Sequence, residues 1–298
     1  MVKSYQDITG DGGSNIVAQV TDQIARLRQR MEQVRHTIVV LSGKGGVGKS
    51  VITANIAYLL AGRGHRVGAL DVDFSGPSLA KMLGVRGQQL KMTSDGVLPA
   101  SGNLGLKVMS LDLLLPGDES PVTWKGPADS TAIWQGTMET TVLRELLSDT
   151  EWGELDFLLL DLPAGTTKLP AVAQLIPNLD GAIVVTIPSE ISYFVVKKTV
   201  TLVKELGMTV LGLVENMAGY HCQHCGTVGE LFGTTQRGED TARSLEIPFL
   251  GKIPFDSRLG ECTDRGQPFI LKYPDSTATV SLKGIADSIE IFLEEAEK

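Results

Sequence analysis

The chain has 298 residues, of which 42% are hydrophobic and 21% are charged, and its formal net charge is −8. This size and composition suit a globular protein with a substantial core, and the acidic balance disfavours nonspecific binding to nucleic acid or anionic membrane. No apolar run approaches the roughly 20 residues of a membrane-spanning helix, and residues 1–13 lack the apolar segment of a signal peptide. We therefore expect a cytoplasmic protein with no nucleic-acid or membrane partner.

The first 35 residues are predicted to form an extension that contains one amphipathic helix. Apolar residues recur at spacings of three and four from Ile16 to Val34, which places them along one side of a helix. We expect this side to pack on the rest of the protein, and contact with a partner is the alternative. The predicted division is 1–35 for the extension and helix and 36–298 for the main domain.

Strands and helices alternate from Thr37 onward. Aliphatic and β-branched runs predict strands at 37–41, 66–72, 106–111, 157–162, 181–187, 210–215 and 249–253. Helical patterns lie between most of them, notably at 51–60, 192–206 and 278–297, and 88–105 is predicted to be a loop or hairpin. Apolar strands separated by helices indicate an α/β fold with a mostly parallel sheet and helices on both faces.

The segment between the first strand and the first helix fits the phosphate-binding pattern G-x-x-x-x-G-K-[ST] at every fixed position. Backbone N–H groups of such a loop, at the start of a helix, bind anions. Lys49 is predicted to reach the β- and γ-phosphates of a nucleotide, and the Ser50 hydroxyl to bind Mg²⁺. The predicted nucleotide-binding residues here are Gly43, Lys44, Gly45, Gly46, Val47, Gly48, Lys49, Ser50 and Val51.

Three carboxylates follow predicted strands, where ligands bind in open α/β sheets. Asp71 and Asp73 close the second strand, and Asp161 closes the fourth. A carboxylate in such a place holds Mg²⁺ directly or through water, and a second one orients the attacking water. We expect Asp71 and Asp161 to serve nucleotide binding and Asp73 to serve catalysis. A helix cap or structural hydrogen bond is the alternative for Asp71.

Lys44 is a second lysine inside the loop, and this form of the loop resembles the deviant Walker A motif of MinD/ParA-type ATPases. The resemblance implies a homodimer in which Lys44 reaches the partner's nucleotide and neutralises developing phosphate charge. Lys44, Lys49 and Asp73 are therefore the expected catalytic residues. An exposed loop lysine is the alternative for Lys44.

Cys222 and Cys225 are spaced so that both thiolates can reach one metal ion or cluster. Because a structural site normally has four ligands, the pair must be completed, either by the flanking His221 and His224 or by the same pair of a second chain. A redox pair and two uninvolved loop cysteines are further alternatives. Cys262 stands alone and is expected to be buried or half-buried.

The P-loop, the Asp-x-Asp segment and the Cys-x-x-Cys pair together resemble the Mrp family of P-loop iron–sulfur carrier proteins, also called ApbC-like. The resemblance covers roughly Ile24 to Pro268. Besides the motifs already described it includes, in order, Gly76-Pro77-Ser78, Trp124-Lys125-Gly126-Pro127, Trp152-Gly153-Glu154-Leu155-Asp156, Asp161-Leu162-Pro163, Val214-Glu215-Asn216-Met217, Phe232-Gly233 and Pro248-Phe249-Leu250-Gly251-Lys252-Ile253-Pro254. The joint order of these segments is more specific than any one of them.

This resemblance implies a P-loop ATPase, with ATP or ADP and Mg²⁺ bound, that hydrolyses ATP slowly. It also implies a homodimer bridged by Cys222 and Cys225, which assembles a [4Fe–4S] cluster and passes it to apo-proteins. Zinc is an alternative occupant of the same thiolates. By position, Asn216 would contact adenine, and the loop from Pro254 to Asp256 would line the adenine pocket. A structural role is the alternative for Asn216.

The chain departs from the family pattern in the loop after Asp161. The usual Asp-x-Pro-Pro-Gly-Thr-Gly-Asp is replaced by a segment with Ala164, Thr167 and Lys168. Loss of a glycine removes easy access to positive φ, and Lys168 reverses a charge near the expected phosphates. Nucleotide binding is expected to survive, whereas the changes bear on hydrolysis and on its coupling to the cysteine loop.

Two other functions fit parts of the sequence. A MinD/ParA-like positioning ATPase would bind membrane through a basic amphipathic helix at its C-terminus, whereas the apolar stripe from Leu282 to Leu293 is followed here by glutamates. A zinc-bridged nucleotide-binding regulator with little turnover would suit the altered loop.

Overall fold

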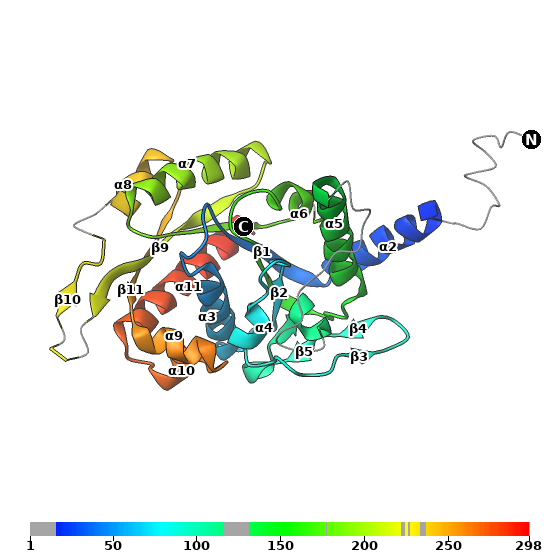
Figure 1. Cartoon of the computed structure of the whole chain (residues 1–298), viewed down its shortest axis with the longest axis horizontal. Coiled ribbons are helices and arrows are strands. Elements are labelled where there is room, and N and C mark those ends of the chain that lie inside the picture. The colour runs from blue at the N-terminus through cyan, green and yellow to red at the C-terminus, as the bar shows by residue number, and fades with distance from the viewer. Residues whose placement is uncertain are drawn as a thin grey trace, which may run out of the picture.

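A computed structural model describes residues 16–115, 131–176, 178–221, 224–225, 227–232 and 237–297. The predicted motif at Trp124–Pro127 and the side chain of Cys222 lie outside the described residues. Within them, helices cover both faces of one central sheet (Figure 1). The predicted α/β fold with a mostly parallel sheet is therefore confirmed.

The sheet is built around β1, which lies between β7 and β8 and is buried along most of its length. The strand order is β11-β9-β8-β1-β7-β2-β6-β5, all parallel except β5, and β10 forms an antiparallel hairpin with the end of β9. The strand bounds are β1 (Val34–Ser42), β2 (Val67–Asp71), β5 (Ala100–Ser101), β6 (Lys107–Met109), β7 (Leu155–Asp161), β8 (Gly181–Thr186), β9 (Val210–His221), β10 (Val228–Gly229) and β11 (Phe249–Phe255).

Two hydrophobic clusters attach the helices to the sheet. One face carries α3 (Lys49–Gly62), α4 (Leu79–Met82), α9 (Ser257–Asp264), α10 (Phe269–Lys272) and α11 (Thr277–Ala296). The other face carries α2 (Ile16–Met31), α5 (Thr131–Asp149), α6 (Leu169–Leu175), α7 (Glu190–Glu205) and α8 (Arg237–Ser244). The burial of both strand faces explains why the strands are almost continuously apolar.

The helix in the N-terminal extension packs on the domain, as predicted. In α2, Leu27 is buried in the cluster formed with α5, and Arg144 of α5 donates a hydrogen bond to Gln23 at 2.7 Å. The boundary between the extension and the main domain stays a prediction. None of the helices in the described part of the chain has the length and apolarity to span a bilayer.

Two segments differ from the predicted boundaries. The strand predicted at 106–111 ends at Met109, because the Ser110 hydroxyl accepts the N–H of Asp112 and caps the 3₁₀ helix η2 (Leu111–Leu114). The strand predicted at 210–215 continues to His221 as β9. The segment at 88–105 contains the predicted hairpin, formed by β3 (Lys91–Met92) and β4 (Val97–Leu98), followed by β5 and η1 (Asn103–Gly105).

Candidate functional site

The P-loop joins β1 to α3 at the edge of the sheet where the parallel strands end. Gly48 caps α3 with φ of +81°, a left-handed conformation that favours glycine. A Cβ at Gly48 would also lie 2.3 Å from the Asn216 amide nitrogen, so the loop and the end of β9 are in close contact. The cavity against this loop has a volume of about 180 Å³, and Asp73, Met82 and Ala164 also line it.

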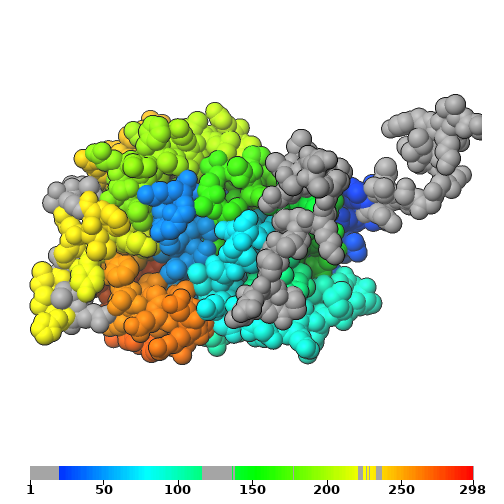
Figure 2. Space-filling view, in the orientation of Figure 1, coloured from blue at the N-terminus to red at the C-terminus, as the bar shows by residue number. Residues whose placement is uncertain are grey.

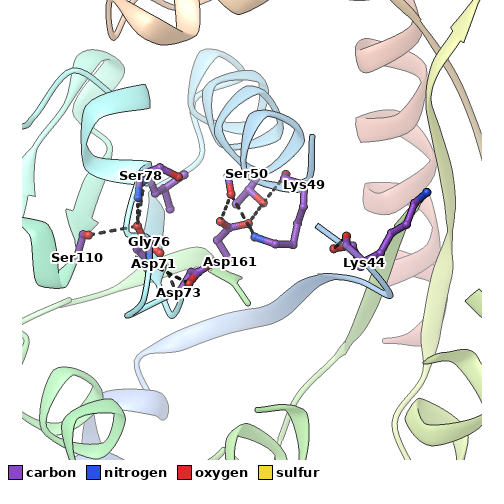
Figure 3. Close-up of polar contacts among 12 residues, drawn as sticks. Lys44, Lys49, Ser50, Asp71, Asp73, Gly76, Ser78, Ser110 and Asp161 are labelled. Atoms are coloured by element: carbon purple, nitrogen blue, oxygen red, sulfur yellow. Dashed lines mark hydrogen bonds and ion pairs between the residues drawn. The ribbon is translucent and has the colours of Figure 1, made fainter. Parts of the chain in front are cut away.

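Lys49, Ser50 and Asp161 form one polar cluster at the start of α3 (Figure 3). The Lys49 ammonium lies 2.7 Å from Asp161 Oδ1, and the Ser50 hydroxyl donates to Asp161 Oδ2 at 2.5 Å. Thr53, one turn further along α3, donates to Asp161 Oδ1 at 2.7 Å. The structure thus brings together the predicted phosphate-binding lysine, the magnesium-binding hydroxyl and the carboxylate that ends β7.

Asp71 lies beside this cluster, since it is paired in register with Asp161 on the neighbouring strand. Its carboxylate is 1% exposed and accepts hydrogen bonds from the backbone N–H groups of Ser78 at 2.9 Å and Leu79 at 3.0 Å. The Ser110 hydroxyl lies 3.2 Å away (Figure 3). These contacts correspond to the structural alternative for Asp71, and its part in nucleotide binding stays a prediction.

The Asp71 carboxyl is expected to make folding stability depend on pH. Burial, followed by the nearby charge of Asp161, raises the pKa of Asp71 to about 7. Between about pH 4 and pH 7 the folded protein keeps a proton that the unfolded chain has released, so stability falls as the pH rises, by up to about 1.4 kcal/mol per pH unit. Asp71→Asn should flatten this slope in urea unfolding of the nucleotide-free protein.

Asp73→Asn is the matched control for this measurement, because Asp73 is two residues away and only half-buried. The slope should persist in that variant. An unchanged slope in Asp71→Asn would show that the Asp71 carboxyl is ionised in the folded protein across the whole range.

Asp73 and Lys44 occupy different sides of the P-loop. Asp73 lines the P-loop cavity, and its carboxylate accepts the N–H of Gly76 at 3.2 Å. Lys44 points away from Asp161, and its ammonium lies 3.5 Å from the hydroxyl of Ser189, which caps α7 (Figure 3). Lys44 thus makes no contact with the Lys49 cluster within the described residues, and its action on a partner's nucleotide stays a prediction.

The residues predicted around adenine divide between two places. The Asn216 amide donates to the carbonyl of Val47 in the P-loop at 2.9 Å, which is the structural role left open for it. Asp256 caps α9 and forms an ion pair with Arg258 at 2.6 Å. Pro254 and Asp256 line a larger cavity, of about 450 Å³, whose lining does not include the P-loop. Their contact with adenine stays a prediction.

Cys225, one residue of the predicted metal-binding pair, lies between β9 and β10, and Cys222 is outside the described residues. Cys225 is exposed, with its sulfur 3.2 Å from the Thr227 hydroxyl, and His224 is also exposed. Because the side chains of His221 and Cys222 are outside the described residues, no ligand set is defined there. Among the described side chains, no group of three metal-ligating residues occurs. Cys262 is buried on α9, as expected, and burial raises the pKa of its thiol.

Comparison with known proteins identifies the family of this chain. A family model described as NUBPL iron-transfer P-loop NTPase, of the ParA type, matches residues 33–133 and 127–290. The chain belongs to this family. The resemblance to P-loop iron–sulfur carriers is thereby confirmed, as is the predicted P-loop NTPase fold.

Three proteins similar to this chain illustrate the match. It is 41% identical to an iron-sulfur cluster carrier protein of Saccharolobus solfataricus, over 89% of this chain and 86% of that protein. It is 37% identical to a cytosolic Fe-S cluster assembly factor, a NUBP2 homolog, of Dictyostelium discoideum, over 87% of this chain and 95% of that protein. A nucleotide-binding protein from Archaeoglobus fulgidus, solved with ADP and with Co, is 36% identical with a TM-score of 0.70, and the alignment covers 82% and 92% of the chains.

The loop after Asp161 makes a contact that the sequence analysis missed. Lys168 forms an ion pair with Glu139 of α5, and the Glu139 carboxylate is buried. The lysine charge is therefore paired with a carboxylate of α5, and the effect of Lys168 on the phosphates stays a prediction. Gly165, with φ of +90°, donates its N–H to the Ser42 carbonyl at 2.9 Å and attaches the loop to β1.

Two other polar residues near the P-loop and β9 were not predicted. Thr53 stands one helical turn after Lys49, and a hydroxyl at that spacing in the first turns of the P-loop helix is a usable sequence signal. Glu215 is a buried carboxylate on β9 that accepts the Tyr193 hydroxyl at 2.6 Å. Its partner lies 22 residues earlier on α7, so no local pattern indicates it.

Proposed function

We propose that this protein is an ATP-hydrolysing carrier that assembles an iron–sulfur cluster on Cys222 and Cys225 and passes it to apo-proteins. The single observation that carries the proposal is the path of β9. This strand places Asn216 against the P-loop and then leads directly into the Cys-x-x-Cys hairpin. One strand therefore links a nucleotide site to a thiolate pair, in a chain of the iron-transfer NTPase family.

The residues of the P-loop cluster suit the binding of ATP. The Lys49 ammonium would move from Asp161 to contact the β- and γ-phosphates, and the loop N–H groups would bind the phosphate oxygens. When bound, Mg²⁺ would neutralise charge on the phosphates, with Ser50 and Asp161 as the residues that hold it. Asp73 lines the same cavity, and we propose that it orients the attacking water.

The cysteine pair would need ligands from a second chain to hold a cluster. Two thiolates supply half of the four ligands of a [4Fe–4S] cluster, and twofold symmetry would bring the other two. The proposed protein is thus a homodimer bridged by the two Cys222–Cys225 pairs, in which Lys44 acts across the interface. The relative from Dictyostelium is named as a cytosolic factor, which supports a cytoplasmic location for this chain.

Anaerobic reconstitution with iron and sulfide tests the proposal. We expect about four iron atoms per dimer, with the absorption of an iron–sulfur cluster, in the wild type. Cys222→Ser and Cys225→Ser should each lose nearly all of this iron and still bind ATP. Cys262→Ser is the matched control, because that thiol is buried on α9, and it should retain the wild-type iron content.

Two results would contradict the proposal. Retention of a full cluster in both hairpin variants would place the iron elsewhere. Absence of iron from the wild type, with about one zinc per dimer and no phosphate release, would instead support a zinc-bridged nucleotide-binding regulator. The Lys168–Glu139 ion pair favours that second function. It attaches the loop after Asp161 to α5, which the usual acidic residue could not do.

A further inference from the structure

The middle of β9 contacts the phosphate-binding loop through two consecutive residues. Asn216 donates to the Val47 carbonyl at 2.9 Å. Met217 is half-buried, and its terminal methyl group lies 3.8 Å from the position that a Cβ at Gly48 would take. A change in the P-loop backbone on nucleotide binding would therefore alter the contacts of both residues.

β9 has an irregularity at the same point. Ile253 of β11 pairs with Asn216 and Phe255 pairs with Tyr220, so β9 uses four steps where β11 uses two. Met217, at the start of this bulge, has φ of +55°, and Gly219 has φ of +103°. A methionine in the left-handed region is uncommon and strained, and such residues persist only where their surroundings hold them.

The strand is held firmly on the side of the bulge nearer the sheet. Glu215 is 1% exposed, accepts the Tyr193 hydroxyl at 2.6 Å, and is paired with both neighbouring strands. Displacement of the residues before Met217 is thus opposed by α7, β8 and β11. Any response to the P-loop is transmitted more easily towards the hairpin.

The other side of the bulge leads to the cysteines. Tyr220 and His221 pair with β10, and the Cys-x-x-Cys segment forms the connection between the two strands. The hairpin projects from the end of the sheet in Figure 1, and its residues form one edge of the face shown in Figure 2 (yellow). Phe255 is its neighbour across the bulge, with its ring 6.2 Å from that of Tyr220. A small rotation at Met217 would displace the exposed Cys225.

We propose that the β9 bulge, residues Asn216 to Gly219, is the hinge that transmits nucleotide occupancy of the P-loop to the cysteine hairpin, with Met217 as its positioning residue. This inference rests on the proposed function. A ligand shifts a conformational equilibrium only if it binds the two conformations with different affinity, and the contacts of Asn216 and Met217 with the P-loop supply that difference. The second conformation would be one in which Met217 leaves its strained, left-handed φ. The strand can relax in this way when the contacts with the P-loop change.

The alkylation rate of Cys225 in the metal-free, reduced protein measures this coupling. We expect the rate constants without nucleotide, with ADP and with ATP to differ by about fivefold or more in the wild type, the lower range of allosteric coupling. Met217→Gly, which accepts positive φ without strain, should bring the ratio close to one and still bind nucleotide. Met217→Ala keeps the strain and should keep a response.

Glu246→Gly is the matched control. Glu246 is exposed, lies in the turn after α8 and has φ of +52°, so this change relieves the same strain in a residue that contacts neither the P-loop nor the hairpin in the described structure. It should keep the wild-type ratio. Cys262, which is buried, reports folding in every sample, since its alkylation accelerates only when the protein opens.

A wild-type ratio in Met217→Gly, with nucleotide bound, would overturn the hinge. If that variant does not fold, amide hydrogen exchange of residues 217–221 in the wild type decides, and protection that is the same with and without nucleotide would also overturn it. Failure of the proposed function has a different signature. In that case the wild type holds no iron on reconstitution, whatever the alkylation rates.

Discussion

Lys49→Met is expected to destabilise the nucleotide-free protein as well as to weaken nucleotide binding. The Lys49 ammonium lies 2.7 Å from Asp161, and the two side chains are 7% and 0% exposed. Removing one partner of a buried ion pair leaves the other charge uncompensated, which costs about 3 kcal/mol. Loss of charge-assisted hydrogen bonds to the phosphates should lower nucleotide affinity by a factor of about 10 to 100.

Urea unfolding and calorimetric titration with ATP separate the two effects. Adding Asp161→Asn to Lys49→Met should recover most of the stability, because the buried negative charge is gone, but none of the affinity. Lys44→Met is the control within the same loop. The Lys44 ammonium makes a long contact with the Ser189 hydroxyl, at 3.5 Å, and its loss should leave stability near that of the wild type. Wild-type stability in Lys49→Met would show that the Lys49–Asp161 ion pair does not stabilise the folded protein.

Lys168→Met is expected to produce a comparable loss of stability at a position where the sequence shows only a charge reversed from the family pattern. The Lys168 and Glu139 side chains are 18% and 8% exposed, so their ion pair is largely removed from water. Burial also lowers the pKa of the Lys168 ammonium, which reflects its poor hydration there. We expect the variant to be less stable by about 3 kcal/mol, because Glu139 is left buried without its cation.

A double-mutant cycle measures this ion pair. Lys168→Met combined with Glu139→Gln should be more stable than Lys168→Met alone, which gives a positive coupling energy. Lys168→Asp, which restores the acidic residue of the family pattern, should be the least stable of the set because it brings a second carboxylate to Glu139. Additive effects in the cycle would mean that the two charges do not interact, and phosphate release in the double variant shows whether the attachment to α5 limits turnover.

The elements of the fold and the P-loop were predictable from local patterns. Buried parallel strands are continuously apolar, so β1 and β7 stand out, and the carboxylates that end strands lie together because parallel strands end at one edge. The glycine at position 48 is required both by its left-handed φ and by the closeness of Asn216, but only the first reason is visible in the spacing of the motif. The contact with Asn216 joins segments 169 residues apart.

The features that the sequence analysis missed also depend on contacts between segments that are distant in the sequence. Lys168 is a charge reversal in the sequence, and only the position of α5 supplies Glu139 as its partner. The bulge in β9 depends on the register with β11, and the φ of Met217 follows from contacts on both sides of the strand rather than from its own residue type. Local sequence determined the elements, the phosphate loop and the cysteine spacing, because each follows from neighbouring residues. Tertiary structure decided which charges are paired and where the backbone is strained, because those depend on the packing of distant segments.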